Sequence, residues 1–102
     1  MGANMDRFED IRNWAEARNL LEGSSPSKQL NKLMEEIGEL AHGINKGKTG
    51  EVVDGIGDAV VVLTILAAQH NLAIEDCIDA AWQEIKDRKG AMRDGVWIKE
   101  GD

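Results

Sequence analysis

The sequence feature that most constrains the fold is a run of apolar residues at helical spacing between residues 27 and 44. Apolar side chains recur there at intervals of three, four, three and four positions, at Leu30, Leu33, Ile37, Leu40 and Ile44. This spacing is typical of a helix that packs nearly antiparallel to its neighbours. Ser25 as N-cap and Pro26 at the first helical position predict where the helix begins.

Three further segments carry helix signals. Asp6-Arg7-Phe8-Glu9 has the form of a capping box, which predicts a helix from about Asp6 to Leu21. A helix is also expected from about Glu51 to Asn71, central and buried because its second half is apolar nearly all round. Another is expected from about Ile74 to Lys89, with Lys86, Arg88 and Lys89 near its end, where basic residues suit the helix dipole.

Asp94-Gly95 separates two short apolar-bearing arms near the C-terminus, which is the signal of a β-hairpin. A two-stranded ribbon is marginal alone, so we expect it to pack on the helices or on another subunit. The predicted fold class is therefore all-α, a four-helix bundle with a short C-terminal β-hairpin.

Length and charge limit the possible functions. A chain of 102 residues is expected to be one domain, for which oligomerisation would help stability. The net charge of −7 argues against nucleic acid as a partner. The single Cys77 fits a reducing compartment, and the sequence has no signal-peptide pattern and no apolar run long enough for a membrane span. We therefore expect a soluble, cytoplasmic protein, with residues 1–4 a vector-derived remnant ahead of a natural start at Met5.

Acidic residues at two places predict a metal site. Glu35, Glu36 and Glu39 crowd one side of the helix predicted around them. Asp58 opens the apolar run 59–66, where an ionised carboxylate is unfavourable to bury unless a cation or a donor meets it. Two antiparallel helices that bring these acids together would form an all-oxygen site suited to Mg²⁺ or Mn²⁺. The alternative for the glutamates is a solvated helix face, which leaves Asp58 unexplained.

With these acids and the ending Glu84-Ile85-Lys86-Asp87-Arg88-Lys89-Gly90, the chain resembles the MazG-like nucleoside triphosphate pyrophosphohydrolases, above all their short, often phage-borne members. That family's signature is Glu-Glu-x-x-Glu followed by Glu-x-x-Asp on the next helix. The resemblance implies an all-α NTP pyrophosphatase fold, Mg²⁺ dependence, and hydrolysis of a (deoxy)nucleoside triphosphate to monophosphate and pyrophosphate, as in clearing the nucleotide pool. It also implies a homodimer or homotetramer with helices shared across the subunit interface.

The resemblance assigns roles to individual residues. Glu36 and Glu39 match metal-binding glutamates, and Asp58 matches the metal-binding aspartate. Glu35 matches an acid that can orient or deprotonate the attacking water. For substrate binding, the candidates are Lys32, Lys86 and Arg88 at the phosphates and Trp14 at the base. Simpler interpretations are that the bases at positions 86 and 88 are helix-dipole partners and that Trp14 is a core or interface residue.

Position 55 departs from the family pattern. The family's Glu-x-x-Asp has a glutamate there, whereas this chain reads Gly55-Ile56-Gly57-Asp58. One expected metal ligand is therefore missing. Asp54 is a candidate substitute, although a shift of one position rotates a side chain by about 100° around the helix.

Two other functions fit parts of the sequence. The substitution at Gly55 raises the alternative of a catalytically weakened module that binds nucleotide or only assembles. Glu39-Leu40-Ala41-His42 has the Glu-x-x-His pattern of ferritin-like metalloproteins, but such proteins need that pattern on two helices. The other histidine, His70, has Ala67 three residues before it, so the second half is absent.

Overall fold

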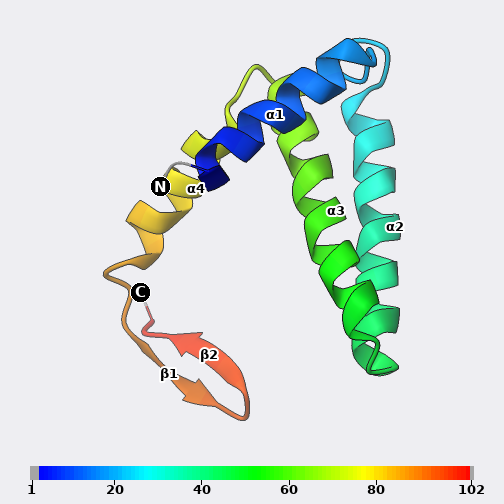
Figure 1. Cartoon of the computed structure of the whole chain (residues 1–102). Coiled ribbons are helices and arrows are strands. Elements are labelled where there is room, and N and C mark those ends of the chain that lie inside the picture. The colour runs from blue at the N-terminus through cyan, green and yellow to red at the C-terminus, as the bar shows by residue number, and fades with distance from the viewer. Residues whose placement is uncertain (1–2, 102) are drawn as a thin grey trace.

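The chain folds into four helices followed by a β-hairpin, which confirms the predicted fold class (Figure 1). The computed structural model describes residues 3–101, with side chains from residue 7 onward. Part of the expected N-terminal remnant, residues 1–2, and the Asp6 side chain of the expected capping box lie outside this description. The elements are α1 (Ala3–Ala17), α2 (Pro26–Asn45), α3 (Thr49–Gln69), α4 (Ile74–Ile85), β1 (Gly90–Arg93) and β2 (Val96–Lys99).

Helices α2 and α3 lie side by side as an antiparallel pair, and α1 crosses α3 near its C-terminal end (Figure 1). Helix α3 is central, as predicted, because it contacts α1, α2 and α4. Helix α4 and the antiparallel β1–β2 hairpin extend to one side as an arm, and none of the α4 residues is buried. No helix among the described residues combines the length and the apolar character needed to cross a bilayer.

Three helices end in the same way, through a residue with left-handed backbone. Asn19, Gly47 and Asn71 have φ of 57°, 66° and 58°. In each case the next residue's N–H closes the helix end by donating to a carbonyl five residues earlier, in the pairs Leu20 to Ala15, Lys48 to Gly43 and Leu72 to Ala67. This is the Schellman arrangement, which asparagine tolerates almost as glycine does. It explains why α1 and α3 end before the predicted Leu21 and Asn71.

Of two predicted helix boundaries, the start of α2 is confirmed and the end of α4 is not. The predicted start of α2 is confirmed, because the Ser25 hydroxyl accepts a hydrogen bond from the Lys28 N–H and Pro26 is the first helical residue. Helix α4, in contrast, ends at Ile85, so the prediction that it reaches Lys89 was wrong. Lys86 and Arg88 follow the helix instead of occupying its last turn.

The predicted packing seam of α2 was also partly wrong. The α2 residues buried in the chain are Gln29, Glu36 and Gly43, with Leu33 and Leu40 half-buried between them. This seam keeps Leu33 and Leu40 but has Gln29, Glu36 and Gly43 in place of Leu30, Ile37 and Ile44, which rotates its centre by about 50° around the helix. Three expected seam residues are consequently exposed on the neighbouring face: Leu30 to 49%, Ile37 to 44% and Ile44 to 61%.

The exposed side of the α2–α3 pair is apolar. Because the pair is antiparallel, the residue after each seam position points to the same side of both helices. On that side lie Leu30, Met34, Ile37 and Ile44 of α2 and Val53, Ile56, Val60 and Leu63 of α3, all exposed. We call this set the outer apolar face. Residues that precede the seam positions, Glu35 and Asp54 among them, project to the opposite side.

An ion pair joins the arm to α1. The Arg12 guanidinium donates to both carboxylate oxygens of Glu75 in α4, at 2.6 and 2.7 Å, and also contacts Glu9. The hydrogen bonds from Arg12 lower the pKa of Glu75 to about 2. The same pairing raises the pKa of Arg12 further above its usual range. The start of α4 is therefore fixed by a bidentate, half-buried contact.

Candidate metal centre

Three carboxylates from α2 and α3 converge at one point. Each of the residues Glu36, Glu39 and Asp58 offers one carboxylate oxygen, and these three oxygens lie within 4.8 Å of one another. Glu36 and Glu39 lie one turn apart on α2, and the antiparallel packing of α3 places Asp58 beside them. Three carboxylate oxygens at such short range repel one another unless a cation lies between them.

Glu36 is the buried member of this cluster. Its residue is only 5% exposed, and its Oε1 atom is buried without a hydrogen-bond partner among the described residues. Its other oxygen, Oε2, lies 3.4 Å from the Lys32 Nζ. From its place at the start of an apolar run, Asp58 was the acid expected to share an apolar face, but Asp58 is exposed and Glu36 instead lies in the α2–α3 seam. The rotated α2 seam accounts for the burial of Glu36. Asp58 is exposed because it precedes the buried Ala59 of α3 and projects to the same side as Asp54.

The closeness of these acids affects the pKa of Glu39 and of the neighbouring Lys32. The pKa of Glu39 is raised, first by a hydrogen bond with Glu36 and then by the charge of that carboxylate, with a smaller effect from Asp58. The pKa of Lys32 is also raised, mainly by its hydrogen bond with Glu36. A hard divalent cation such as Mg²⁺ or Mn²⁺ would relieve the repulsion and provide the missing partner for the buried Glu36 oxygen. The donor set therefore fits such an ion.

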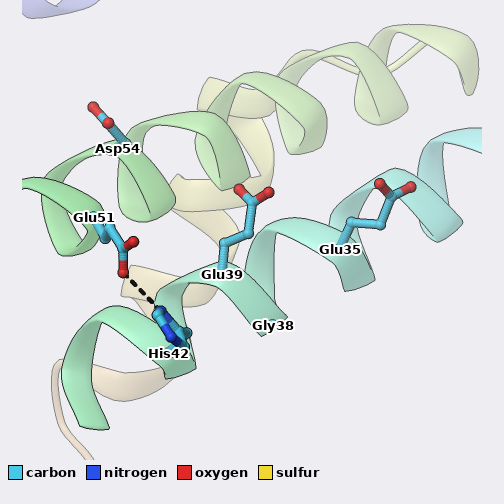
Figure 2. A pocket seen from close by; sticks show the side chains of 6 residues that line it. All are labelled: Glu35, Gly38, Glu39, His42, Glu51 and Asp54. Atoms are coloured by element: carbon cyan, nitrogen blue, oxygen red, sulfur yellow. Dashed lines mark hydrogen bonds and ion pairs between the residues drawn. The ribbon is translucent and has the colours of Figure 1, made fainter. Parts of the chain in front are cut away.

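A cavity of about 520 Å³ opens beside the cluster (Figure 2). Helix α2 lines it with Glu35, Gly38, Glu39 and His42. The first turns of α3 line it with Glu51 and Asp54. A Cβ added at Gly38 would meet no atom within 4 Å, so this glycine borders open space rather than a neighbouring helix.

Asp54 does not join the three-carboxylate cluster, although it lines the same cavity. Figure 2 shows its side chain projecting away from the Glu39 carboxylate. The groups among the described residues that could hold a metal include Asp58 but neither Asp54 nor Glu35. The structure thus brings together three of the four predicted metal ligands and leaves Asp54 and Glu35 at the rim.

Gly55 is a packing residue in this structure. A Cβ at position 55 would lie 2.9 Å from the Leu40 Cβ and 3.0 Å from the Leu40 Cα of α2. Gly43 makes the reciprocal approach, because a Cβ there would lie 2.8 Å from the Glu51 Cβ. The two glycines let α2 and α3 approach closely between the three-carboxylate cluster and the connection that joins the two helices. A glutamate at position 55 would meet the α2 backbone, so this packing cannot accommodate the family's usual ligand.

Sequence reasoning missed two residues of the cavity, His42 and Glu51. The His42 Nδ1 and the Glu51 Oε2 lie 2.9 Å apart and link α2 to the start of α3 (Figure 2). The sequence does contain a signal for Glu51, because Glu51-Val52-Val53-Asp54 is itself a Glu-x-x-Asp pattern. It begins four residues before position 55, where the family pattern was expected to begin.

Asp58 also borders a second cavity, of about 390 Å³, between α1 and α3. Its other lining residues are Asp10, Ile11, Trp14 and Val61. Trp14 is 45% exposed, and the Arg18 guanidinium lies 4.5 Å from the centre of its ring. The chain thus places the predicted base-binding aromatic next to a carboxylate of the candidate metal centre.

The predicted phosphate-binding residues are divided between two places. Lys32 contacts the cluster through Glu36. Lys86 and Arg88 follow α4 in the arm, and Figure 1 shows this segment apart from α2 and from the α2-facing side of α3. Arg88 there pairs with Glu84 at 3.5 Å.

Comparison with known proteins gives a family match over most of the chain. A family model described as the MazG nucleotide pyrophosphohydrolase domain matches residues 24–92, which include the three cluster carboxylates and Gly55. An uncharacterized 18.2 kDa protein from the rep–hol intergenic region of Haemophilus phage HP1 is 51% identical over 65 residues, or 64% of this chain. The chain spans about 40% of that relative's length. No solved structure matches.

Proposed function

Because this chain belongs to the MazG nucleotide pyrophosphohydrolase domain family, we propose that it hydrolyses (deoxy)nucleoside triphosphates to the monophosphate and pyrophosphate in a Mg²⁺-dependent reaction. The observation that carries the proposal is the convergence of Glu36, Glu39 and Asp58, with a buried and unpartnered oxygen on Glu36. A role in clearing the nucleotide pool would place the protein in the cytoplasm.

The proposed reaction gives each acid a role. Glu36, Glu39 and Asp58 would hold the ion, for which Mn²⁺ is an alternative to Mg²⁺. When bound, the ion neutralises phosphate charge and favours formation of a nucleophilic water. Glu35, at the rim of the cavity, would orient or deprotonate the water that attacks the α-phosphorus. The bond from that phosphorus to the bridging oxygen breaks, and pyrophosphate leaves.

Substrate binding would draw on both cavities. Lys32 would contact phosphate oxygens beside the cluster, and Trp14 would stack on the base. Lys86 and Arg88 lie in the arm of the same chain, so we propose that they reach the acidic centre of another copy.

We further propose a homodimer or homotetramer. The outer apolar face places eight large apolar side chains in solvent, on the side of the α2–α3 pair opposite Glu35 and Asp54. Two such faces packed together would form a four-helix bundle with the acidic centres turned outward. Trp82 and Trp97 in the arm are also about half exposed, which supports contacts between the arm and another subunit.

A second candidate function rests on Gly55. If three carboxylates are too few for turnover, the chain would be a nucleotide-binding or assembly module of the same fold. This alternative predicts nucleotide binding without release of pyrophosphate.

Pyrophosphate release from a panel of NTPs and dNTPs, with Mg²⁺ and with EDTA, tests the proposal. Asp58→Asn and Glu39→Gln should abolish metal-dependent release while the helical far-UV signal stays intact. Asp79→Asn, the same change at an exposed position of α4, is the matched control and should retain activity. Undiminished turnover in both cluster variants would refute the site assignment.

A further inference from the structure

The cavity between α1 and α3 has the composition of a nucleobase site. Ile11, Trp14 and Val61 give it an apolar and aromatic lining, and the two polar residues that line it are Asp10 and Asp58. Its volume of about 390 Å³ lies within the range of small-molecule sites. A flat base would gain both apolar burial and stacking there.

The cavity adjoins the candidate metal centre at Asp58, which lines the cavity and is one of the three cluster carboxylates. A nucleotide whose phosphates lie beside Asp58 could therefore place its base between α1 and α3. This step rests on the proposed function. Asp58 faces the phosphates in that arrangement, which leaves Asp10 as the lining polar group available to the edge of the base.

Asp10 has acceptor capacity to offer. Among the described residues, the Asp10 Oδ2 atom accepts a hydrogen bond from the Arg7 guanidinium at 2.8 Å. Both partners are mostly exposed, with side chains 72% and 58% accessible, so this i,i+3 pair is weak and exchangeable. An ionised carboxylate only accepts hydrogen bonds. A base is therefore favoured there if it presents donors.

We propose that Asp10 selects guanine nucleotides as the substrate class. The guanine edge presents two adjacent donors, N1–H and the 2-amino group, which match the two oxygens of one carboxylate. Cytosine and adenine present a single amino group beside an acceptor nitrogen. Thymine and uracil present one N–H between two carbonyl oxygens, which a carboxylate repels.

Matched nucleotides test this directly in wild-type protein. The measurement is kcat/KM for pyrophosphate release with dGTP, dITP, dXTP and dTTP in Mg²⁺. Hypoxanthine lacks only the 2-amino group of guanine, so dITP should be about tenfold poorer than dGTP. Equal values for dGTP, dITP and dTTP would overturn the inference while leaving the proposed function standing. No release from any nucleotide would overturn both.

The variant Asp10→Asn provides a second test. An amide presents one acceptor and one donor, which suits the N1–H and 2-oxo group of xanthine, so the variant should lose preference for dGTP and gain preference for dXTP. Asp79→Asn removes the same charge from α4 and should keep the wild-type order. An unchanged dGTP-to-dXTP ratio in Asp10→Asn would contradict the assignment. Far-UV circular dichroism checks that the variant is folded.

Discussion

Gly55 of α3 lies directly against Leu40 of α2, so closely that a Cβ at position 55 would be 2.9 Å from the Leu40 Cβ. The residue that replaces an expected metal ligand is thus also the residue that lets the two helices meet. One turn further along α3, Asp58 lies beside Glu36 and Glu39. The missing glutamate and the close packing are one structural feature.

Substitutions at two glycines should therefore have opposite effects. Gly55→Ala and Gly55→Glu force α2 and α3 apart and should lower the free energy of unfolding by about 1–3 kcal/mol, more for the larger side chain. Gly38→Ala adds a methyl group in open space and should raise the free energy of unfolding by up to about 1 kcal/mol. Urea denaturation of the three variants measures this. A fully stable Gly55→Glu protein would contradict the packing described for Gly55.

Glu36→Gln should separate stability from metal binding. The substitution removes a buried charge that repels Glu39, so in EDTA the variant should melt at a temperature equal to or above that of the wild type. Added Mg²⁺ should raise the melting temperature of the wild type, because the ion binds only the folded state, and should have little effect on the variant. Differential scanning calorimetry with and without Mg²⁺ checks both. An equal Mg²⁺ response in the two proteins would exclude Glu36 as a ligand.

The Arg12–Glu75 pair should make stability depend on pH in the acid range. The pKa of Glu75 is lowered to about 2 in the folded state, from a usual value of 4.5. The pair thus stabilises the fold fully above about pH 4.5, and that contribution is lost as the pH falls toward 2. Glu75→Gln should lower the melting temperature at pH 7, and its difference from the wild type should shrink between pH 4.5 and 2. Glu84→Gln, at an exposed α4 position, should show no such trend.

The outer apolar face should govern assembly. Ile37→Glu places a charge in its middle and should convert the oligomer to monomer, because a buried charge without a partner is strongly unfavourable. Asn31→Glu introduces the same carboxylate on α2 away from that face and should leave assembly unchanged. Light scattering coupled to gel filtration gives the masses. A monomeric wild-type protein, or an Ile37→Glu variant of unchanged mass, would contradict the proposed interface.

Much of the fold was predictable because its signals are local. The Ser25-Pro26 start of α2, the apolar run of α3 and the Asp94-Gly95 turn each depend on a few adjacent residues. The ends of α1 and α3 were less visible, because Asn19 and Asn71 adopt the left-handed conformation that the sequence signals most clearly with glycine.

The side of α2 that packs against α3 could not be predicted from periodicity alone. Helix α2 carries two overlapping stripes at helical spacing that share the half-buried Leu33 and Leu40. One continues through exposed apolar residues, and the other contains the buried Glu36 and Gly43. Only the close approach at Gly43 and Gly55, a tertiary effect, decides which stripe meets α3. For the same reason, Glu36, Glu39 and Asp58 could be named from their spacing, whereas the burial of Glu36 could not.

The most direct test of the central claim is pyrophosphate release by the wild-type protein, with Asp58→Asn and Asp79→Asn alongside, in Mg²⁺ and in EDTA. The three-carboxylate centre predicts release from at least one nucleoside triphosphate in Mg²⁺, none in EDTA, none with Asp58→Asn, and wild-type release with Asp79→Asn. Release that persists in EDTA, or that Asp58→Asn leaves intact, would contradict the claim that these carboxylates form a catalytic metal centre.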